Sequence, residues 1–185
     1  MARSLIWPMS GLTRPAHTGR MSGTLYFYRT AHPFSNFHPS RFSVQGETFY
    51  WAEQYLMARK AALFGDAVRR RAILAATSPA ECKALGRQVT SFDPAVWERE
   101  RLGIALDMLR LKFGQSAALR RALLDTGDAE LVEAAADDRI WGIGFSEAQA
   151  EGARQAWGLN LLGQALMGVR SELQAQAIDL HLSAS

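Results

Sequence analysis

The sequence contains a single cysteine, Cys82, among 185 residues. One cysteine forms no internal disulfide, which excludes a disulfide-stapled secreted domain and fits a reducing compartment. Cys82 lies inside a predicted helix with no histidine nearby in the sequence, so we expect a buried and inert thiol. This cysteine usage favours a cytoplasmic protein.

Long hydrophobic runs are also absent. No segment approaches the roughly 18 apolar residues that a membrane-spanning helix needs, so we expect no membrane association. The short apolar stretch at residues 5–9 is interrupted by Pro8 and is too short for a secretory signal. Residues 1–23 are rich in Pro, Gly, Ser, Thr and Arg, and we expect a flexible leader there, with Met21 as an alternative start to Met1.

Motifs for metals, nucleotides and hydrolytic serines are missing. There is no Walker loop and no Gly-x-Ser-x-Gly elbow, and Gly142 and Gly144 lack the third glycine of a dinucleotide fingerprint. The histidines form no i, i+4 pair and have no cysteine partner. We therefore expect no metal and no cofactor. The histidines are His17, His32, His38 and His181.

The charge balance is only weakly basic, with 21 Lys and Arg against 18 Asp and Glu and a net charge of +3. Such a balance slightly favours anionic partners, and phosphate-bearing small molecules suit it as well as nucleic acid does. The length and the 48% hydrophobic content are those of one globular domain with a sizeable core.

The hydrophobic pattern predicts an α+β, mostly helical domain at residues 24–176, followed by a tail at 177–185. A β-branched and aromatic run at 24–28 predicts a strand, and 42–44 with 48–50 predict a hairpin around Gly46, giving a small antiparallel sheet near the start. Residues 131–135 fit a short strand or a helix, and 137–146 a loop. Helices are expected at 51–64, 66–76, 78–86, 93–113, 116–127, 147–157 and 160–176.

The helix after the hairpin carries two charges on one face. Glu53 and Lys60 are seven residues apart, so they project from the same side two turns apart. They fall within a predicted apolar stripe, where charges are unfavourable unless they are paired or face a cleft. A structural ion pair, side chains reaching solvent from the edge of the stripe, and a pocket wall all remain open. The stripe consists of Phe49, Leu56, Met57, Leu63 and Phe64.

Two loops carry further candidate groups. Asp137 and Asp138 precede Trp141 and a Gly-x-Gly turn, which suits recognition of a sugar or a base, or else a solvated acidic turn beside a core tryptophan. The earlier loop Phe34-Ser35-Asn36-Phe37 offers aromatic rings and small hydrogen-bonding groups, or else two core anchors.

Basic residues on the second and third helices fit a phosphate-binding patch or a solvated face. Arg87 is the stronger phosphate candidate because it follows Gly86 at a helix end. The residues concerned are Arg69, Arg70, Arg71, Lys83 and Arg87.

The ordered motifs together resemble the NADAR (YbiA-like) family over residues 24–174. The resemblance implies a single, mostly helical domain with N-glycosidase activity. Its implied substrates are phosphorylated ribosylaminopyrimidines of riboflavin biosynthesis, or ADP-ribosylated guanine in nucleic acid. The motifs are Phe34-Ser35-Asn36-Phe37, Ala52-Glu53-Gln54-Tyr55 with Lys60, Gly86-Arg87, Trp97, Lys112-Phe113, Leu131-Val132-Glu133, Trp141-Gly142, Asn160-Leu161-Leu162-Gly163, Leu166-Met167 and Arg170.

The resemblance also implies site residues. Glu53, Lys60 and Asp138 are the expected catalytic residues: Glu53 stabilises charge or activates water, and Asp138 positions ribose hydroxyls or water. Lys60 either holds phosphate and orients Glu53, or attacks the opened sugar to form a Schiff base. Some relatives carry an acidic residue where this chain has Ile143, which leaves the choice of substrate open. The expected substrate-binding residues are Ser35, Asn36, Phe37, Arg87, Trp97, Trp141, Gly142 and Asn160.

Two other function classes stay open at this point. A non-catalytic ADP-ribose or nucleotide-binding module would use the same pocket and release its ligand unchanged. A nucleic-acid-binding regulator would show binding that depends steeply on salt. The presence of Glu53, Lys60 and Asp138 together favours the enzyme. The pattern does not indicate an oligomeric state.

Overall fold

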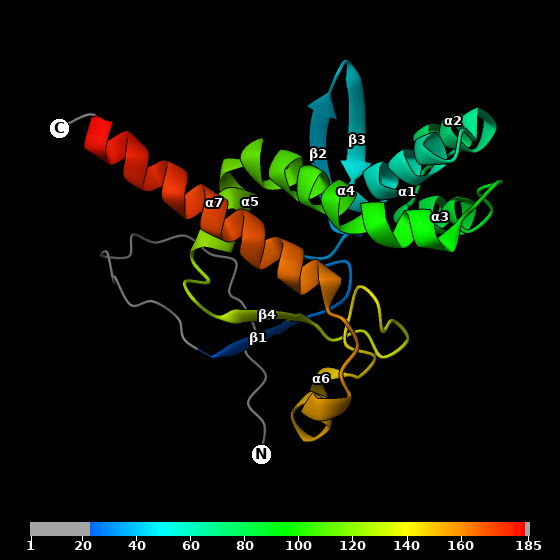
Figure 1. The fold of residues 1–185 in the computed structure, drawn as a ribbon. Coiled ribbons are helices and arrows are strands. Elements are labelled where there is room, and N and C mark those ends of the chain that lie inside the picture. Colours follow the sequence, from blue (N-terminus) through cyan, green and yellow to red (C-terminus); the bar gives the residue numbers. More distant parts are fainter. Residues whose placement is uncertain (1–22, 184–185) are drawn as a thin grey trace.

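The computed structural model describes residues 23–183, with side chains described as far as residue 177. The expected leader therefore lies outside the described residues, apart from Gly23. The described part is one mostly helical α+β domain, as expected, with two separate two-stranded sheets (Figure 1). Its elements are β1 (Thr24–Phe27), β2 (Pro39–Val44), β3 (Glu47–Trp51), α1 (Ala52–Leu63), α2 (Ala67–Ala75), α3 (Pro79–Gly86), α4 (Pro94–Gly114), α5 (Ala117–Leu124), β4 (Glu130–Glu133), α6 (Glu147–Ala150), the 3₁₀ helix η1 (Glu151–Ala156) and α7 (Leu161–Ser183).

The expected hairpin is formed by β2 and β3, which pair antiparallel. Its two turn residues, Gln45 and Gly46, have φ angles of 52° and 82°. Positive φ at both positions is the requirement of a type I′ turn, whose twist matches that of the flanking strands. Phe42 and Phe49 pair across the hairpin and stack with ring centroids 5.7 Å apart, so this small sheet contributes one face to the core.

The first strand does not join the antiparallel sheet. β1 pairs in parallel with β4, with Phe27 opposite Glu133. Parallel strands need a long crossover, and here the hairpin and helices α1–α5 lie between the two strands in the chain. The local pattern at residues 131–135 did not distinguish strand from helix, because the partner that decides it is more than 100 residues away.

Side-chain caps start the helices where the sequence indicates. Ser78, Asp93 and Ser116 each accept a hydrogen bond from a backbone N–H in the first turn of the following helix. The prediction of a single helix at 147–157 is wrong, because the α-helix α6 ends at Ala150 and the chain continues as the 3₁₀ helix η1. The last helix, α7, continues to Ser183, past the expected domain end at residue 176.

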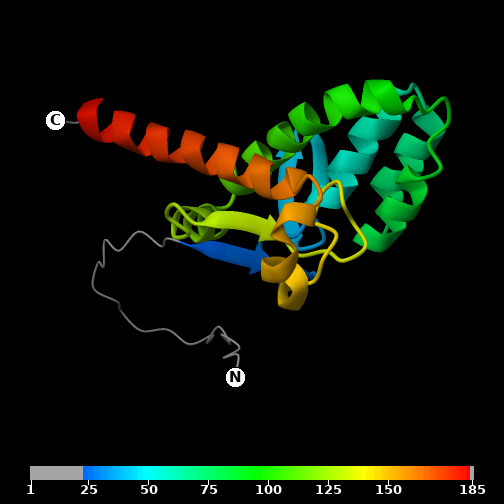
Figure 2. The ribbon, with the colours of Figure 1, turned by 60° about the horizontal axis from the view of Figure 1, so that its bottom comes forward.

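The core lies between α1, α4, α7 and the two sheets, and α1 is its centre. Residues 52–58 are all buried, so α1 is enclosed on most sides and does not present a single stripe. Leu63, expected within that stripe, is 37% exposed, because it lies in the last turn, where α1 reaches the surface. In both views α7 lies along α4 and over β4 (Figures 1 and 2).

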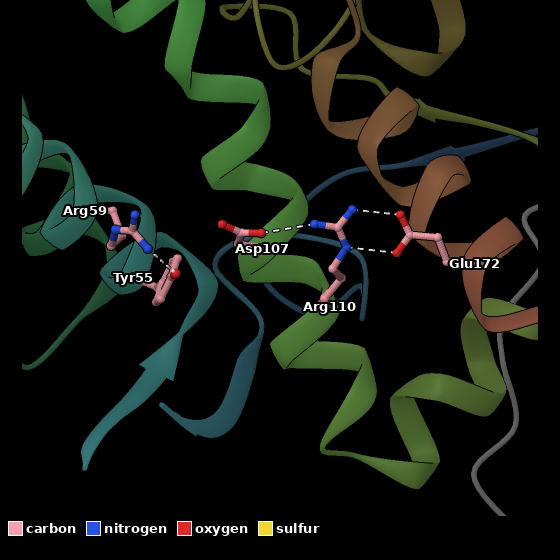
Figure 3. A network of polar contacts seen from close by, with 5 residues as sticks. All are labelled: Tyr55, Arg59, Asp107, Arg110 and Glu172. Atoms are coloured by element: carbon pink, nitrogen blue, oxygen red, sulfur yellow. Dashed lines mark hydrogen bonds and ion pairs between the residues drawn. The ribbon is translucent and has the colours of Figure 1, made fainter. Parts of the chain in front are cut away.

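A forked ion pair joins α4 to α7. Arg110 donates to both carboxylate oxygens of Glu172 at 2.8 Å and to Asp107 at 3.0 Å (Figure 3). This geometry fits the planar guanidinium, although partly exposed pairs typically contribute only about 1 kcal/mol or less. Within residues 23–183, no helix is both long and apolar enough to span a membrane.

Candidate active site

A cavity of about 300 Å³ lies where α1, α3, the start of α4 and the end of β4 meet. This volume is at the lower end of the range for small-molecule sites. Figure 1 shows the loop after β4, in yellow, on the side of the molecule where α3 lies. The lining residues are Ser35, Asn36, Phe37, Glu53, Met57, Lys60, Lys83, Gly86, Arg87, Trp97, Glu133, Asp138, Ile140 and Trp141.

The structure thus brings together most of the residues that the sequence singled out. All three expected catalytic residues, Glu53, Lys60 and Asp138, line the cavity. Of the eight expected substrate-binding residues, Gly142 and Asn160 are not among the lining residues. The other six come from four separate segments of the chain.

Glu53 lies in the first turn of α1 and is only 6% exposed. Its backbone N–H donates to the carbonyl of Asn36 at 3.0 Å, which fixes the loop before β2 against the start of the helix. Burial raises the pKa of the Glu53 carboxyl to about 7, with Asp138 adding to the rise and Lys83, Arg87 and Lys60 opposing it. This carboxyl can therefore exchange a proton near neutral pH.

Lys60 lies on the same face of α1, two turns after Glu53. Its Nζ donates to the carbonyl of Gly86 at 2.9 Å and lies 4.3 Å from the centroid of the Phe92 ring. Of the ion pairs within residues 23–183, none joins Glu53 to Lys60, so the structural ion pair that the sequence left open is not formed. Burial lowers the pKa of the Lys60 ammonium, although Glu53 opposes that shift.

Asp138 is held in a tight turn after β4. Its Oδ1 accepts from the backbone N–H groups of Ile140 at 2.9 Å and Trp141 at 2.8 Å, which fixes the carboxylate and the tryptophan relative to each other. Both side chains line the cavity. The expected acidic turn therefore contributes Asp138 and Trp141 to the cavity wall, while Asp137 and Arg139 are exposed.

Glu133 is a site residue that the sequence reasoning did not select. It ends β4 and lines the cavity. One of its carboxylate oxygens, Oε2, is buried and has no hydrogen-bond partner among the described residues. Burial raises the pKa of Glu133 to about 8, and the nearby carboxylates Asp138 and Glu53 add to this shift. The sequence feature that could have identified Glu133 is its position directly after the apolar pair Leu131-Val132, at the end of a possible strand.

Asn160 and Gly142 support this wall from behind. Asn160 accepts from the backbone N–H of Glu133 at 3.0 Å and donates to the carbonyl of Leu131 at 2.9 Å. A Cβ added to Gly142 would lie 2.8 Å from the carbonyl oxygen of Glu133, so only glycine permits this approach. Both residues thus position the end of β4.

The basic side of the cavity is formed by α3. Lys83 and Arg87, the helix C-cap, both line it, whereas Arg69, Arg70 and Arg71 do not. A Cβ at Gly86 would collide with the side chain of Met57, so this glycine lets α3 pack against α1. The sequence indicated Lys83 only as one member of a basic patch. Its place in the cavity wall follows from the packing of α3 against α1, which the sequence pattern does not show.

The loop of Ser35, Asn36 and Phe37 closes another side. Lys112, which is 1% exposed, donates to the carbonyl of Ser35 at 2.9 Å and supports the loop from the core. Asn36 has a buried Oδ1 without a hydrogen-bond partner in the described structure. An oxygen of this kind in a cavity wall can accept a hydrogen bond from a ligand. Phe34, by contrast, is a core anchor that is 2% exposed.

The remaining expectations concern metals and the cysteine. Across the described residues, no three His, Cys, Asp or Glu side chains are grouped as metal ligands. Cys82 is fully buried, as expected, and burial raises the pKa of its thiol to about 12. It is therefore a poor nucleophile.

Several known proteins are similar to this chain. The N-glycosidase R617 of Acanthamoeba polyphaga mimivirus is 41% identical over 150 residues, covering 77% of this chain and 88% of that protein. The riboflavin biosynthesis protein VVA0006 of Vibrio vulnificus is 33% identical, covering 85% of this chain and 40% of that protein. The NMR structure of Escherichia coli YbiA matches with a TM-score of 0.67 and 29% identity, covering 86% of this chain and 88% of that one.

The family comparison covers nearly the whole described domain. The model of the NADAR domain matches residues 26–174, which include every residue that lines the cavity. The chain belongs to the NADAR domain family.

Proposed function

We propose that the protein is a cytoplasmic N-glycosidase that hydrolyses the bond between ribose C1 and nitrogen in a phosphorylated substrate. The observation that carries the proposal is that one cavity is lined by both carboxyl groups and cations. Glu53, Glu133 and Asp138 supply the carboxyl groups, and Lys60, Lys83 and Arg87 supply the cations. Relatives named N-glycosidases support the reaction class.

The carboxyl groups of the cavity fit the chemistry of a ribosyl C–N bond. Breaking that bond builds positive charge at C1, which a nearby carboxylate stabilises. Glu53 is placed for this role at the start of α1, and its raised pKa also lets it accept a proton from water. Asp138, fixed by two backbone N–H groups, positions the ribose hydroxyls or water.

The cations of the cavity fit a phosphate group on the substrate. Arg87 and Lys83 come from the end of α3, where both reach the cavity without an ion-pair partner in the described structure. Guanidinium and ammonium groups bind phosphate through charge-assisted hydrogen bonds. Trp97 and Trp141 offer faces for stacking a base, and Asn36 offers an acceptor oxygen for a hydroxyl or amino group.

Lys60 has two chemically consistent roles. As a cation it binds phosphate and orients Glu53. As a neutral amine it attacks C1 of the opened sugar and forms a Schiff base, a role favoured by the burial that lowers its pKa. The two roles differ in whether a covalent intermediate forms.

Two substrate classes match this combination of carboxyl groups and cations. One is a ribosylaminopyrimidine phosphate of riboflavin biosynthesis. The relative VVA0006 is named a riboflavin biosynthesis protein, which supports this class. The other is ADP-ribosylated guanine in nucleic acid. Both present an anionic ribose whose C1 carries an amine nitrogen.

Product analysis by mass spectrometry tests the proposal. Purified protein and its Glu53→Gln variant are incubated separately with a ribosylaminopyrimidine phosphate and with ADP-ribosylated guanine DNA. Release of the free base from one substrate, lost in the variant, supports the N-glycosidase and identifies its substrate class. If neither substrate is cleaved while ADP-ribose binds and is recovered unchanged, the protein is a binding module and the proposal is wrong.

A further inference from the structure

Cleavage of a ribosyl–amine bond needs a proton for the leaving nitrogen, and the proposed function has not yet assigned its donor. The inference below rests on that function. Three carboxyl groups line the cavity, and they differ in how their oxygens are bonded. The Oδ1 atom of Asp138 accepts hydrogen bonds from two backbone N–H groups, whereas the Oε2 atom of Glu133 is buried and has no partner in the part of the chain that the structure describes.

We propose that Glu133 is the general acid that protonates the leaving nitrogen, acting as one half of a carboxyl pair with Glu53. A buried carboxyl oxygen without a protein partner is suited to carrying a proton that it gives to a bound ligand. Glu133 reaches the cavity from β4, while Glu53 reaches it from α1. The two groups thus approach the substrate from different elements.

The proton balance of the step is closed. The C1–N bond breaks, its electron pair passes to nitrogen, and the Glu133 carboxyl proton moves to that nitrogen. A nucleophile with one proton to lose adds to C1 and passes that proton to ionised Glu53; it is water in direct hydrolysis, or the neutral Lys60 amine in the covalent route. In direct hydrolysis, return of the proton from Glu53 to Glu133 restores the starting state. In the covalent route, water then breaks the bond between C1 and Lys60: Glu53 returns its proton to the Lys60 nitrogen, and the proton that water loses passes to Glu133.

The electrostatic surroundings favour this division of roles. Burial, together with nearby Asp138 and Glu53, raises the pKa of Glu133 to about 8, while that of Glu53 rises to about 7. Interacting carboxyls of this kind titrate as a pair, and near neutral pH one of them holds the proton. The charged groups that act on the pair are Lys60 from α1, Lys83 and Arg87 from α3, and Asp137 and Asp138 from the loop after β4.

The position of Glu133 is set by a rigid frame. Its backbone N–H donates to Asn160 at 3.0 Å, its carbonyl accepts from Ile143 at 3.0 Å, and its strand pairs with β1 at Phe27. A catalytic acid benefits from such fixed placement, because proton transfer requires hydrogen-bond distance to the reacting atom.

The test compares two amine leaving groups of different basicity. The probes are the N-ribosyl 5-phosphates of 4-methoxyaniline and 4-nitroaniline, because the nitroaniline departs with far less help from an acid. In Glu133→Gln we expect kcat to fall by at least about 100-fold for methoxyaniline but by no more than about tenfold for nitroaniline. In Glu53→Gln we expect kcat to fall by the same factor for both probes.

The results of this test decide the assignment as follows. Equal losses on both probes in folded Glu133→Gln, judged by circular dichroism, would overturn the assignment, as would an unchanged rate for methoxyaniline. If the variant does not fold, the wild-type pH profiles replace it: an alkaline fall in kcat for methoxyaniline that is absent for nitroaniline supports the acid, and identical profiles refute it. Wild-type protein that cleaves neither probe contradicts the N-glycosidase itself.

Discussion

The side-chain amide of Asn160 accepts a hydrogen bond of 3.0 Å from the backbone N–H of Glu133 and donates one to the carbonyl of Leu131. Asn160 itself adopts a φ of 51°, directly before α7 begins. One residue thus joins the start of the last helix to the end of β4. Its contacts indicate a positioning role and not direct substrate binding.

Replacing Asn160 by alanine is expected to lower the free energy of unfolding by about 2–4 kcal/mol, because two buried backbone groups lose their partners. Chemical denaturation with a circular dichroism readout measures this change. Asn160→Gly serves as the control, since glycine accepts the positive φ and isolates the loss of the hydrogen bonds. An Asn160→Ala variant of normal stability with a raised KM would instead indicate direct substrate contact.

Because the pKa of Glu133 is raised, replacing this residue by the neutral glutamine should increase the free energy of unfolding by an amount that depends on pH. Between its ordinary value of 4.5 and about 8, the native state keeps a proton that the unfolded chain has released. Wild-type stability therefore falls as the pH rises through this window and stays lowered above it. Glu133→Gln removes this fall, so its advantage should be small near pH 4.5 and reach about 2 kcal/mol or more, roughly 5 °C in Tm, by pH 8.

Thermal melting at several pH values checks the Glu133 prediction. Glu98→Gln is a suitable control, because its side chain is 73% exposed. An advantage for Glu133→Gln that is the same at all pH values would show that burial of the carboxylate is not its cause.

The environment of Lys60 predicts a covalent adduct. Burial favours its neutral amine, and its Nζ contacts the Gly86 carbonyl and not a carboxylate. Borohydride added during turnover should therefore trap a sugar adduct on the peptide that contains Lys60, identified by mass spectrometry. Lys60→Arg should give no adduct, whereas Lys83→Arg should retain it. If turnover proceeds and nothing is trapped, Lys60 serves as a cation.

Arg87 is expected to bind the substrate phosphate. Loss of a charged hydrogen bond is worth about 1.5–3 kcal/mol, so Arg87→Gln should raise KM by about 10- to 100-fold with little change in kcat. Steady-state kinetics measure this, and Arg71→Gln, an exposed arginine away from the cavity, is the control. An equal effect of Arg87→Gln on a substrate without phosphate would argue against the contact.

Local signals predicted the parts of the fold that depend on neighbouring residues. The hairpin turn with Gly46 and the caps Ser78, Asp93 and Ser116 are of this kind. The parallel pairing of β1 with β4 depends on a distant partner, and the sequence pattern did not reveal it. The sequence pattern also did not reveal the break between α6 and η1, where a continuous helix was expected.

For the site, helical spacing placed Glu53 and Lys60 on one wall, and the acidic turn was found through Asp138 and Trp141. Glu133 was missed because its role depends on the burial of one oxygen, which follows from tertiary packing. Asn160 and Gly142 were selected as binding residues, whereas their contacts show that they support β4.

The central claim is that Glu53 acts in breaking a ribose–nitrogen bond, and Glu53→Gln tests it most directly. Base release and ligand affinity are measured on the same preparations, with Glu98→Gln as the control. The account predicts that kcat falls by about 100- to 10,000-fold in Glu53→Gln while affinity for the substrate changes little, and that Glu98→Gln behaves as the wild type. Normal turnover in a folded Glu53→Gln protein would contradict it.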